Sequence, residues 1–527
     1  MQPSVYITTP IFYANADPHI GSTYTTVVCD AFARFHRQRG VPTFFLTGTD
    51  EHGEKIAEAA ARDGVTPQAF VDQVSARFRS AWDECGIAYD GFIRTTDAHH
   101  VRFVQDVLAR IHESGDIYFG EYSGLYCIGC ERLYTEKELV GGRCPQHLTE
   151  PVAVSEPNYF FRMSRYQDEL RRHIEATPDF IRPEGYRNEA LAMLREPLDD
   201  LCISRPKTRL DWGIEIPFDR NYVTYVWFDA LLNYPSGLDR AGRMELWPQT
   251  HHFIGKDILK THAVFWPTML MAAGLPLFRH LDVHGFWSSG GQKMSKSLGN
   301  VVQPLEMRDR YGMDTLRYFL LREMSFGQDA DFTEAALIGR RNSDLANGLG
   351  NLASRTLAMS KKWFDGVVQA IEPREPVDVA LERAFARARV ELEEHVQGLA
   401  FHRALESLWR GLDAANKYIV ETAPFTLAKD SSQLPRVGAI LHNCLEALRV
   451  AAQLAAPFMP ETAERLREAL GLDAKRFADL DLPWGTALTP GGRTGDPVNL
   501  FPRIETADGA KTAGRAAGAK AKPDRRS

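Results

Sequence analysis

Near its start the chain contains the stretch Ser4-Val5-Tyr6-Ile7-Thr8-Thr9, which is rich in β-branched residues and is typical of a buried strand. A helical pattern follows from about Pro18 to Arg39, with Asp17 as the expected cap and Gly40 at the stop. Thr43-Phe44-Phe45-Leu46-Thr47 then predicts a second strand, and helical patterns return near residues 54–63 and 67–86. This order of strands and helices predicts a parallel α/β sheet.

The character of the chain changes twice after this start. From 115 to about 160, helical periodicity fades, glycines and aromatics increase, and four metal-type residues gather, which indicates a small inserted module. The α/β character resumes near 213, where Val223–Phe228 and His251–Gly255 are predicted to be strands that enter loops. From about 334 to 471, stretches rich in Ala, Leu, Arg and Glu predict a helix bundle.

Composition excludes several classes of protein. The 527 residues are 44% hydrophobic and 25% charged, which is typical of a globular chain of three or four domains and not of a disordered, collagen-like or disulfide-rich one. The chain has no apolar run of about 18 residues and no secretory signal, and its seven sparse cysteines suit a reducing cytosol, so we expect a cytoplasmic protein with no membrane partner. A net charge of −7 means that nucleic-acid binding, if any, needs a local basic patch.

Four residues have the spacing of a metal site. Cys127-x2-Cys130 and Cys144-x2-His147 form two knuckles with thirteen residues between them. Four soft or borderline ligands close a tetrahedral Zn²⁺ shell and leave no position for water, which predicts one structural zinc and not a catalytic one.

Two further motifs point to phosphates. Pro18-His19-Ile20-Gly21-Ser22 opens a helix directly after a strand and loop, and helix N-termini hold phosphates. Lys293-Met294-Ser295-Lys296-Ser297 follows a glycine-rich run and brings compact positive charge. Either motif alone is weak evidence; together, about 270 residues apart around an α/β sheet, they favour nucleotide chemistry.

These two motifs resemble the signatures of class I aminoacyl-tRNA synthetases. The surrounding residues resemble the methionyl-tRNA synthetase family, in the form with a single zinc in its connective insertion. The resemblance runs from about residue 4 to about residue 465 and rests on these further segments: Tyr13-Ala14-Asn15, Gly48-Thr49-Asp50-Glu51-His52-Gly53, Val226-Trp227-Phe228-Asp229-Ala230, Phe253-Ile254-Gly255-Lys256-Asp257-Ile258, His262-Ala263-Val264-Phe265-Trp266 and Asn351-Leu352-Ala353-Ser354-Arg355.

The resemblance implies both a domain plan and an activity. It implies a Rossmann-like catalytic domain in two halves, which we place at 1–114 and 213–333, with a zinc-binding insertion at 115–212. An all-α anticodon-binding bundle is expected at 334–471. A segment that packs back at 472–505 and a disordered basic tail at 506–527 complete the plan. The implied activity is the ATP- and Mg²⁺-dependent attachment of L-methionine to tRNA(Met) through methionyl adenylate, with release of AMP and diphosphate, for translation initiation and elongation.

The roles of the family's site residues carry over where this sequence matches. The catalytic residues are expected to be His19, Lys293 and Lys296, and ATP is expected to contact these together with Gly21, Ser22, Gly255, Asp257 and Ser295. Asp50 is expected to bind the ammonium of methionine. The side chain of the bound methionine is expected to contact Ile11, Tyr13, Trp227, Ala230, Leu231, Tyr234, Ile258, His262 and Trp266. A polarizable thioether packs well on aromatic edges.

The helical part holds the basic patch that the net charge required. Residues 339–363 contain five Arg or Lys residues and one acid, Asp344. Asn351 and Arg355 are four residues apart and share a helix face, and the family reads anticodon bases there, with Phe425 as a stacking residue. Two positions depart from the family: Ser22 stands where a second histidine is usual, and Phe425 where tryptophan is frequent.

Three alternatives are open at this point. The first is another class I synthetase. One with an editing domain would need more room than the region between the two motifs provides. One with a zinc in its active site would not have this filled two-knuckle ligand pattern. A non-catalytic tRNA-binding scaffold would not need Asp50, His19 and both lysines. A nucleotidyltransferase with the same core would not need the helix bundle. Because the chain ends in a short basic tail, we also expect a monomer that does not bind DNA.

Overall fold

The computed structural model describes residues 4–127, 132–134, 136–145, 148–294 and 300–505. They form two compact units: residues 1–313 with 324–331, and residues 314–323 with 332–527. The expected boundary near 333 assigns α11 (Met313–Glu323) to the catalytic domain. In the structure, residues 314–323 of this helix belong with the helical unit. None of the described helices is long and apolar enough to cross a membrane.

The first unit is built on a parallel sheet, as predicted. The strand order is β2-β3-β1-β13-β14-β8, and β4 also pairs with β3. The strands are β2 (Phe12–Tyr13), β3 (Thr43–Asp50), β1 (Val5–Thr8), β13 (Thr250–Gly255), β14 (His280–His284), β8 (Ile181–Arg182) and β4 (Gly91–Arg94). Every pairing is parallel, and β1, which is wholly buried, lies in the middle. The sequence continues from β1 to β3 on one side and reaches β13 on the other, so a topological switch point lies beside β1.

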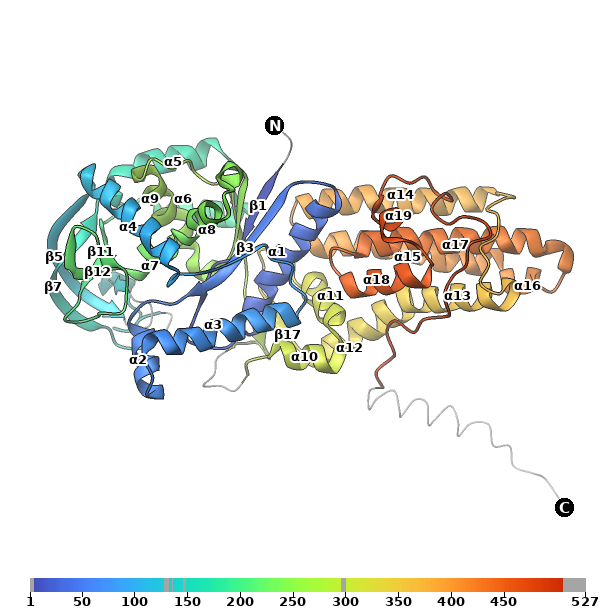
Figure 1. Ribbon diagram of the computed structural model, residues 1–527, viewed down its shortest axis with the longest axis horizontal. Coiled ribbons are helices and arrows are strands. Elements are labelled where there is room, and N and C mark those ends of the chain that lie inside the picture. The colour runs from blue at the N-terminus through green and yellow to red at the C-terminus, as the bar shows by residue number, and fades with distance from the viewer. Residues whose placement is uncertain (1–3, 128–131, 135, 146–147, 295–299, 506–527) are drawn as a thin grey trace, which may run out of the picture. The chain divides into compact units, whose positions relative to one another are not determined.

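The first unit also contains helices, several of which cover this sheet (Figure 1). They are α1 (Ile20–Gln38), α2 (Glu54–Asp63), α3 (Pro67–Glu84), α4 (Ala98–Glu113), α5 (Gln167–Ala176), α6 (Glu184–Met193), α7 (Val226–Ala230), α8 (Asn233–Ala241), α9 (Trp266–Ala272) and α10 (Pro304–Tyr311).

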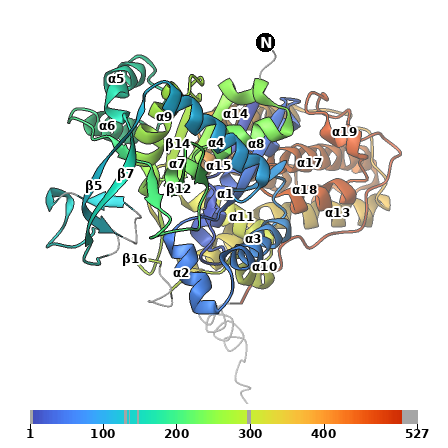
Figure 2. The same ribbon diagram turned by 60° about the vertical axis from the view of Figure 1, so that its left-hand side comes forward.

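The insertion forms its own antiparallel sheet, with the order β6-β5-β7-β9. Its strands are β5 (Ile117–Cys127), β6 (Arg132–Tyr134), β7 (Val152–Phe161) and β9 (Leu201–Cys202), and β5 with β7 forms the long ribbon of Figure 2. Next to it in the chain come β10 (Ser204–Pro206), β11 (Glu215–Ile216) and β12 (Asp219–Thr224), which form a small sheet. Further on, β15 (Trp287–Ser289) and β16 (Gln292–Lys293) form a hairpin.

One strand prediction was wrong. Val223–Phe228 is not a single strand: β12 ends at Thr224, and α7 begins at Val226. The apolar run alone cannot distinguish a buried strand from a short buried helix. The helix places Asp229 within hydrogen-bonding distance of two buried histidines, His52 (2.6 Å) and His100 (2.7 Å).

The second unit is a helix bundle, as predicted. It contains α12 (Glu334–Arg340), α13 (Asn351–Phe364), α14 (Pro376–Gln397), α15 (Phe401–Thr422), α16 (Pro424–Leu427), α17 (Leu434–Ala455), α18 (Pro460–Ala469) and α19 (Ala474–Ala478), with a π-helical segment, Arg341–Gly350, before α13. The long helices α14, α15 and α17 lie side by side (Figure 1). Residues 472–505 return along the bundle, where Trp484 Nε1 donates to Asn443 Oδ1 (2.8 Å) and the Val368 amide donates to the Gly492 carbonyl (2.8 Å). The expected tail, 506–527, lies outside the described residues.

Candidate active site

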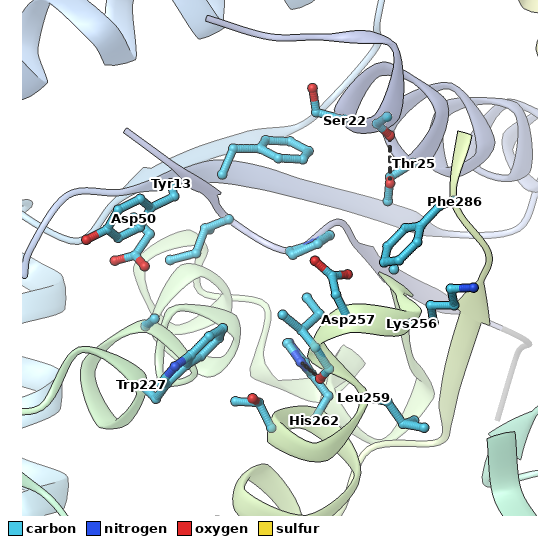
Figure 3. Close-up of a pocket in the computed structure, with 18 of the residues that line it drawn as sticks. Tyr13, Ser22, Thr25, Asp50, Trp227, Lys256, Asp257, Leu259, His262 and Phe286 are labelled. Atoms are coloured by element: carbon cyan, nitrogen blue, oxygen red, sulfur yellow. Dashed lines mark hydrogen bonds between the residues drawn. The ribbon is translucent and has the colours of Figure 1, made fainter. Parts of the chain in front are cut away.

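One pocket of about 1100 Å³ opens at the carboxyl ends of β1, β3, β13 and β14. This is the edge at which an open parallel sheet binds its ligands, beside the switch point. Most of the predicted methionine and ATP residues line it: Ile11, Tyr13, His19, Gly21, Ser22, Asp50, Trp227, Ala230, Leu231, Tyr234, Gly255, Asp257, Ile258 and His262. Figure 3 shows Tyr13, Asp50 and Trp227 at one end and Asp257, Lys256 and Phe286 toward the other.

The first end of the pocket combines one carboxylate with apolar walls. Asp50 is the last residue of β3 and only 6% exposed. Trp227 and Ala230 come from α7, and Tyr234 comes from α8. A buried carboxylate favours a cationic partner, so this end suits an ammonium group with an apolar side chain attached.

His262 and Tyr234 form a polar pair within this apolar wall. Tyr234 Oη and His262 Nε2 are 2.8 Å apart, and His262 Nδ1 is 3.0 Å from the Ile258 carbonyl. The carbonyl can only accept, so Nδ1 carries the proton and Nε2 accepts from the tyrosine hydroxyl. Burial lowers the pKa of His262 to about 4, so the ring is neutral at physiological pH. His262 lies in a π-helical turn, Thr261–Phe265, a rare conformation that is often found at functional sites.

Trp266 does not line the pocket, contrary to the prediction. It is fully buried behind Tyr234, with ring centroids 6.0 Å apart, and donates from Nε1 to His252 Nε2 (3.2 Å). It supports the wall from the second layer, because α9 begins at this residue and turns it toward the sheet core.

The other end of the pocket begins at the N-terminus of α1. The predicted cap was wrong: His19, not Asp17, is the N-cap, and its Nδ1 accepts from the Gly21 amide (3.1 Å). Asp17 instead forms an exposed ion pair with Arg77 (2.6 Å). Since Nδ1 accepts, a neutral His19 ring carries its proton on Nε2, where it can donate to an anion. A side chain at position 21 would lie 2.9 Å from the His19 ring, so Gly21 makes room for this ring.

The hydroxyl of Ser22 is engaged within the helix. It accepts from the His19 amide (3.0 Å) and donates to the His19 carbonyl (2.8 Å), which completes a capping box. Ser22 therefore stabilises the helix end that carries His19.

Residues after β13 and β14 complete this end. Lys256 pairs with Asp329 (2.7 Å), which also accepts from the Phe286 amide (2.8 Å). Asp331 accepts from the Gly291 amide (2.8 Å) and Ser288 Oγ (2.7 Å), and so fixes the turn that leads into β16. Lys293 belongs to β16, whereas Ser295 and Lys296 lie outside the described residues.

The sequence analysis missed several pocket residues. His284 ends β14, lies 2.8 Å from Thr25 Oγ1, and has its pKa lowered by burial to about 4. Asn15, Asn233 and Phe286 also line the pocket. Their position at strand and helix ends was the only signal in the sequence, and it is shared by many loop residues.

Two of the four predicted metal ligands are described. Cys127 and Cys144 are 1% and 0% exposed and pack with Tyr134 in one small cluster. Cys130 and His147 lie outside the described residues. Within the described ranges no three His, Cys, Asp or Glu side chains gather as a metal site.

The helical unit has a second pocket, of about 530 Å³. It is lined by the predicted pair Asn351 and Arg355, and by residues that the sequence did not single out: Ser343, Asp344, Asn347, Gly348, Trp409, Asp413, Asn416, Lys417 and Val420. Trp409 donates from Nε1 to the Asp344 carbonyl (3.2 Å). Phe425, in α16, is 50% exposed and is not among the residues that line this pocket.

Comparison with known proteins gives a consistent result. The family model described as "tRNA synthetases class I (M)" matches residues 5–151 and 147–357, and the "Anticodon binding domain of methionyl tRNA ligase" matches residues 372–521. The chain is 48% identical to the methionine–tRNA ligase of Deinococcus radiodurans over 95% of this chain and 74% of that protein, and 46% identical to that of Caldanaerobacter subterraneus subsp. tengcongensis over 96% and 80%.

A solved structure is similar over almost its whole length. The methionyl-tRNA synthetase of Mycobacterium tuberculosis in complex with methionyl-adenylate has a TM-score of 0.91 and 41% identity, covering 95% of this chain and 100% of that one. With the pocket at the sheet edge, the bundle and these matches in agreement, the chain belongs to the class I methionyl-tRNA synthetases, the enzymes that ligate methionine to tRNA.

Proposed function

We propose that the first pocket activates methionine with ATP and that the helical pocket reads the anticodon of tRNA(Met). The observation that carries the proposal is a single continuous pocket with a buried carboxylate and apolar wall at one end and a helix N-terminus with a histidine cap at the other.

In the first step, a carboxylate oxygen of methionine attacks the α-phosphorus of ATP. The new P–O bond forms as the bond to the leaving pyrophosphate breaks, and pyrophosphate departs with the electron pair. Asp50 holds the ammonium, Asp257 binds the ribose, and His19 with Lys293 and Lys296 stabilises charge on the phosphates. Mg²⁺ on the phosphates supplies further charge neutralisation when bound. The 3′-terminal hydroxyl of tRNA then attacks the methionyl carbonyl, and AMP leaves.

The neutral His262–Tyr234 pair supports methionine as the amino acid. The Tyr234 hydroxyl donates to His262, and both residues lie in the pocket wall with the apolar side chains of Trp227 and Ala230. A polarizable sulfur is compatible with this wall, whereas a charged or amide side chain would lose hydrogen bonds on entry.

The test is amino-acid-dependent ATP–pyrophosphate exchange, measured with all twenty amino acids and without tRNA. We expect exchange with methionine alone. Exchange with another amino acid would contradict the pocket assignment, and a folded, zinc-loaded protein that exchanges with none would contradict adenylation itself.

The insertion is proposed to hold one structural Zn²⁺ through Cys127, Cys130, Cys144 and His147. The two described cysteines fit, since both are buried and packed in the same cluster. We expect one equivalent of zinc by elemental analysis and close to none in Cys144→Ser. A matched Cys202→Ser variant, in the same insertion but outside the knuckles, should keep its zinc; full zinc in Cys144→Ser would remove the proposal.

A further inference from the structure

A buried polar cluster lies behind the methionine end of the pocket, and the steps above do not use it. It joins the ends of four elements through His52, Asp229, His100 and Ser236. His52 Nδ1 is 2.6 Å from Asp229 Oδ2, His100 Nε2 is 2.7 Å from Asp229 Oδ1, and His100 Nδ1 is 2.7 Å from Ser236 Oγ. All four side chains are buried.

Three of the four members, His52, Asp229 and Ser236, are close in sequence to residues of the pocket wall. His52 follows Asp50 by two residues, at the end of β3. Asp229 stands in α7 between Trp227 and Ala230, which line the pocket while Asp229 faces away from it. Ser236 lies one turn after Asn233, another lining residue, and its Oγ donates to the Asn233 carbonyl (3.2 Å).

The cluster is energetically coupled because it has a single carboxylate. Burial alone would raise the pKa of Asp229, but the two imidazoles lower it below its usual value, so the carboxylate is ionised and accepts a hydrogen bond on each oxygen. Removing one donor leaves a buried charge half-satisfied, which destabilises the arrangement far more than the loss of a surface bond.

A second contact places the His52 ring. Trp212 packs on it, with centroids 5.4 Å apart, and donates from Nε1 to the Glu51 carbonyl (2.7 Å). Glu51 itself is fully buried and receives two hydrogen bonds from Arg94 (2.7 and 2.9 Å). Glu51 and His52 therefore have two different anchors, and of residues 50–52 only Asp50 lines the pocket.

We infer that His52 and His100 are positioning residues, which hold Asp229 and thereby fix the distance between Asp50 and the α7 wall that together receive methionine. The inference rests on the proposed function of this pocket. The cluster joins the wall that would contact the ammonium to the wall that would contact the side chain, and its members come from other elements than α1 and the segment of Asp257, where ATP is proposed to bind. Its loss should therefore weaken methionine selectively.

The experiment compares His52→Leu, which removes the donor, with His52→Asn, whose amide N–H can occupy the place of Nδ1–H. We expect His52→Leu to raise the KM for methionine, and its Kd measured without ATP by calorimetry, by about tenfold, with less than a twofold change in the KM for ATP. His52→Asn should restore most of the methionine affinity.

The matched control is His251→Leu. His251 also pairs with a buried aspartate, Asp282, at 3.2 Å, but at the opposite end of β13 from the pocket. It should alter stability without a selective effect on methionine. If His52→Leu does not fold, Ser236→Ala and His100→Asn replace it, and a selective rise in the methionine KM of either supports the inference.

Two results would overturn the inference. The first is an unchanged methionine Kd in folded His52→Leu; the second is an equal loss of methionine and ATP affinity. The failure of the proposed function is a separate outcome, because the wild-type protein itself would then show no exchange with methionine.

Discussion

The two units bury polar groups in different ways. In its described residues the α/β unit buries histidines near the strand ends, including His252, His262 and His284, and they are hydrogen-bonded to hydroxyls and carbonyls. The helical unit buries arginines with carboxylates: Arg436 with Asp378 (2.6 Å) and Arg449 with Glu446 (2.7 Å). A neutral imidazole is both donor and acceptor in a compact ring, whereas a guanidinium keeps its charge at any accessible pH and needs a counter-charge.

The difference separates two tasks. The α/β pocket needs buried groups that are neutral and directional around a reacting ligand, and each histidine supplies one donor and one acceptor. The bundle needs rigid helices that carry a rim of hydrogen-bonding side chains, and the buried Arg436–Asp378 pair joins α17 to α14. The two pockets nevertheless share one device, a π-helical segment in the wall: Thr261–Phe265 in the first and Arg341–Gly350 before Asn351 in the second.

The largest expected effect is that of Asp50→Asn on the α/β pocket. Truncating one partner of a buried charged pair costs about 2–5 kcal/mol, so kcat/KM for methionine should fall about 100- to 1000-fold in pyrophosphate exchange, with little change in the KM for ATP. Asp116→Asn is the matched control, because Asp116 is similarly buried (4% against 6%) but pairs with Arg165 outside the pocket. Equal losses in both variants would mean that Asp50 acts only through stability.

A smaller effect is expected when Arg355 of the helical pocket is changed to alanine. A hydrogen bond to a charged group is worth roughly 1.5–3 kcal/mol, so kcat/KM for tRNA charging should fall roughly 10- to 100-fold while exchange without tRNA is unchanged. Arg383→Ala, an exposed arginine on α14, serves as the control. A parallel fall in exchange would end the division of labour between the two pockets.

Acidification should affect the α/β unit first. Burial lowers the pKa values of His36, His262, His280 and His284 to about 4, against 6.5 when unfolded. Between these values the unfolded chain binds more protons, so stability falls as the pH drops from about 6.5 toward 4.

The buried Arg436–Asp378 pair of the helical unit loses stability in the same direction, on acidification, but in a lower pH range. Burial alone would raise the pKa of Asp378, but Arg436 lowers it, so that stabilisation is lost only below the usual carboxyl range. His402, whose pKa is also lowered by burial, is half-buried and contributes less. Hydrogen exchange corrected for intrinsic rates should show at least about tenfold weaker protection of α/β peptides at pH 5 than at pH 7, and little change in the bundle. Equal loss in both units would refute this difference.

The smallest effect is expected for Ser22→Ala. Loss of the capping bonds should cost about 1 kcal/mol of stability and leave the exchange rate within about twofold, because the hydroxyl bonds to the His19 backbone. Thr333→Ala removes a comparable cap, on α12 of the helical unit, and should cost a similar amount. A tenfold slower exchange in Ser22→Ala alone would place the Ser22 hydroxyl on the phosphates.

The first strands and helices and most of the methionine and ATP residues could be predicted from the sequence. Periodicity identified β1, α1 and β3 because their apolar residues repeat locally. The family motifs named most of the expected methionine and ATP residues that line the pocket. The two-knuckle spacing likewise predicts zinc without any structure, although the complete ligand set is not described.

The direction in which the site side chains point became known only from the three-dimensional structure. In the structure the N-cap of α1 is His19 and not Asp17, and the Ser22 hydroxyl bonds to the helix backbone. Trp266 lies behind Tyr234, and Val226–Ala230 is a helix. It also brought His52, His100 and Asp229 together from positions 129 to 177 residues apart. These outcomes depend on satisfying buried donors and acceptors across distant segments, a condition that no local pattern of the sequence contains.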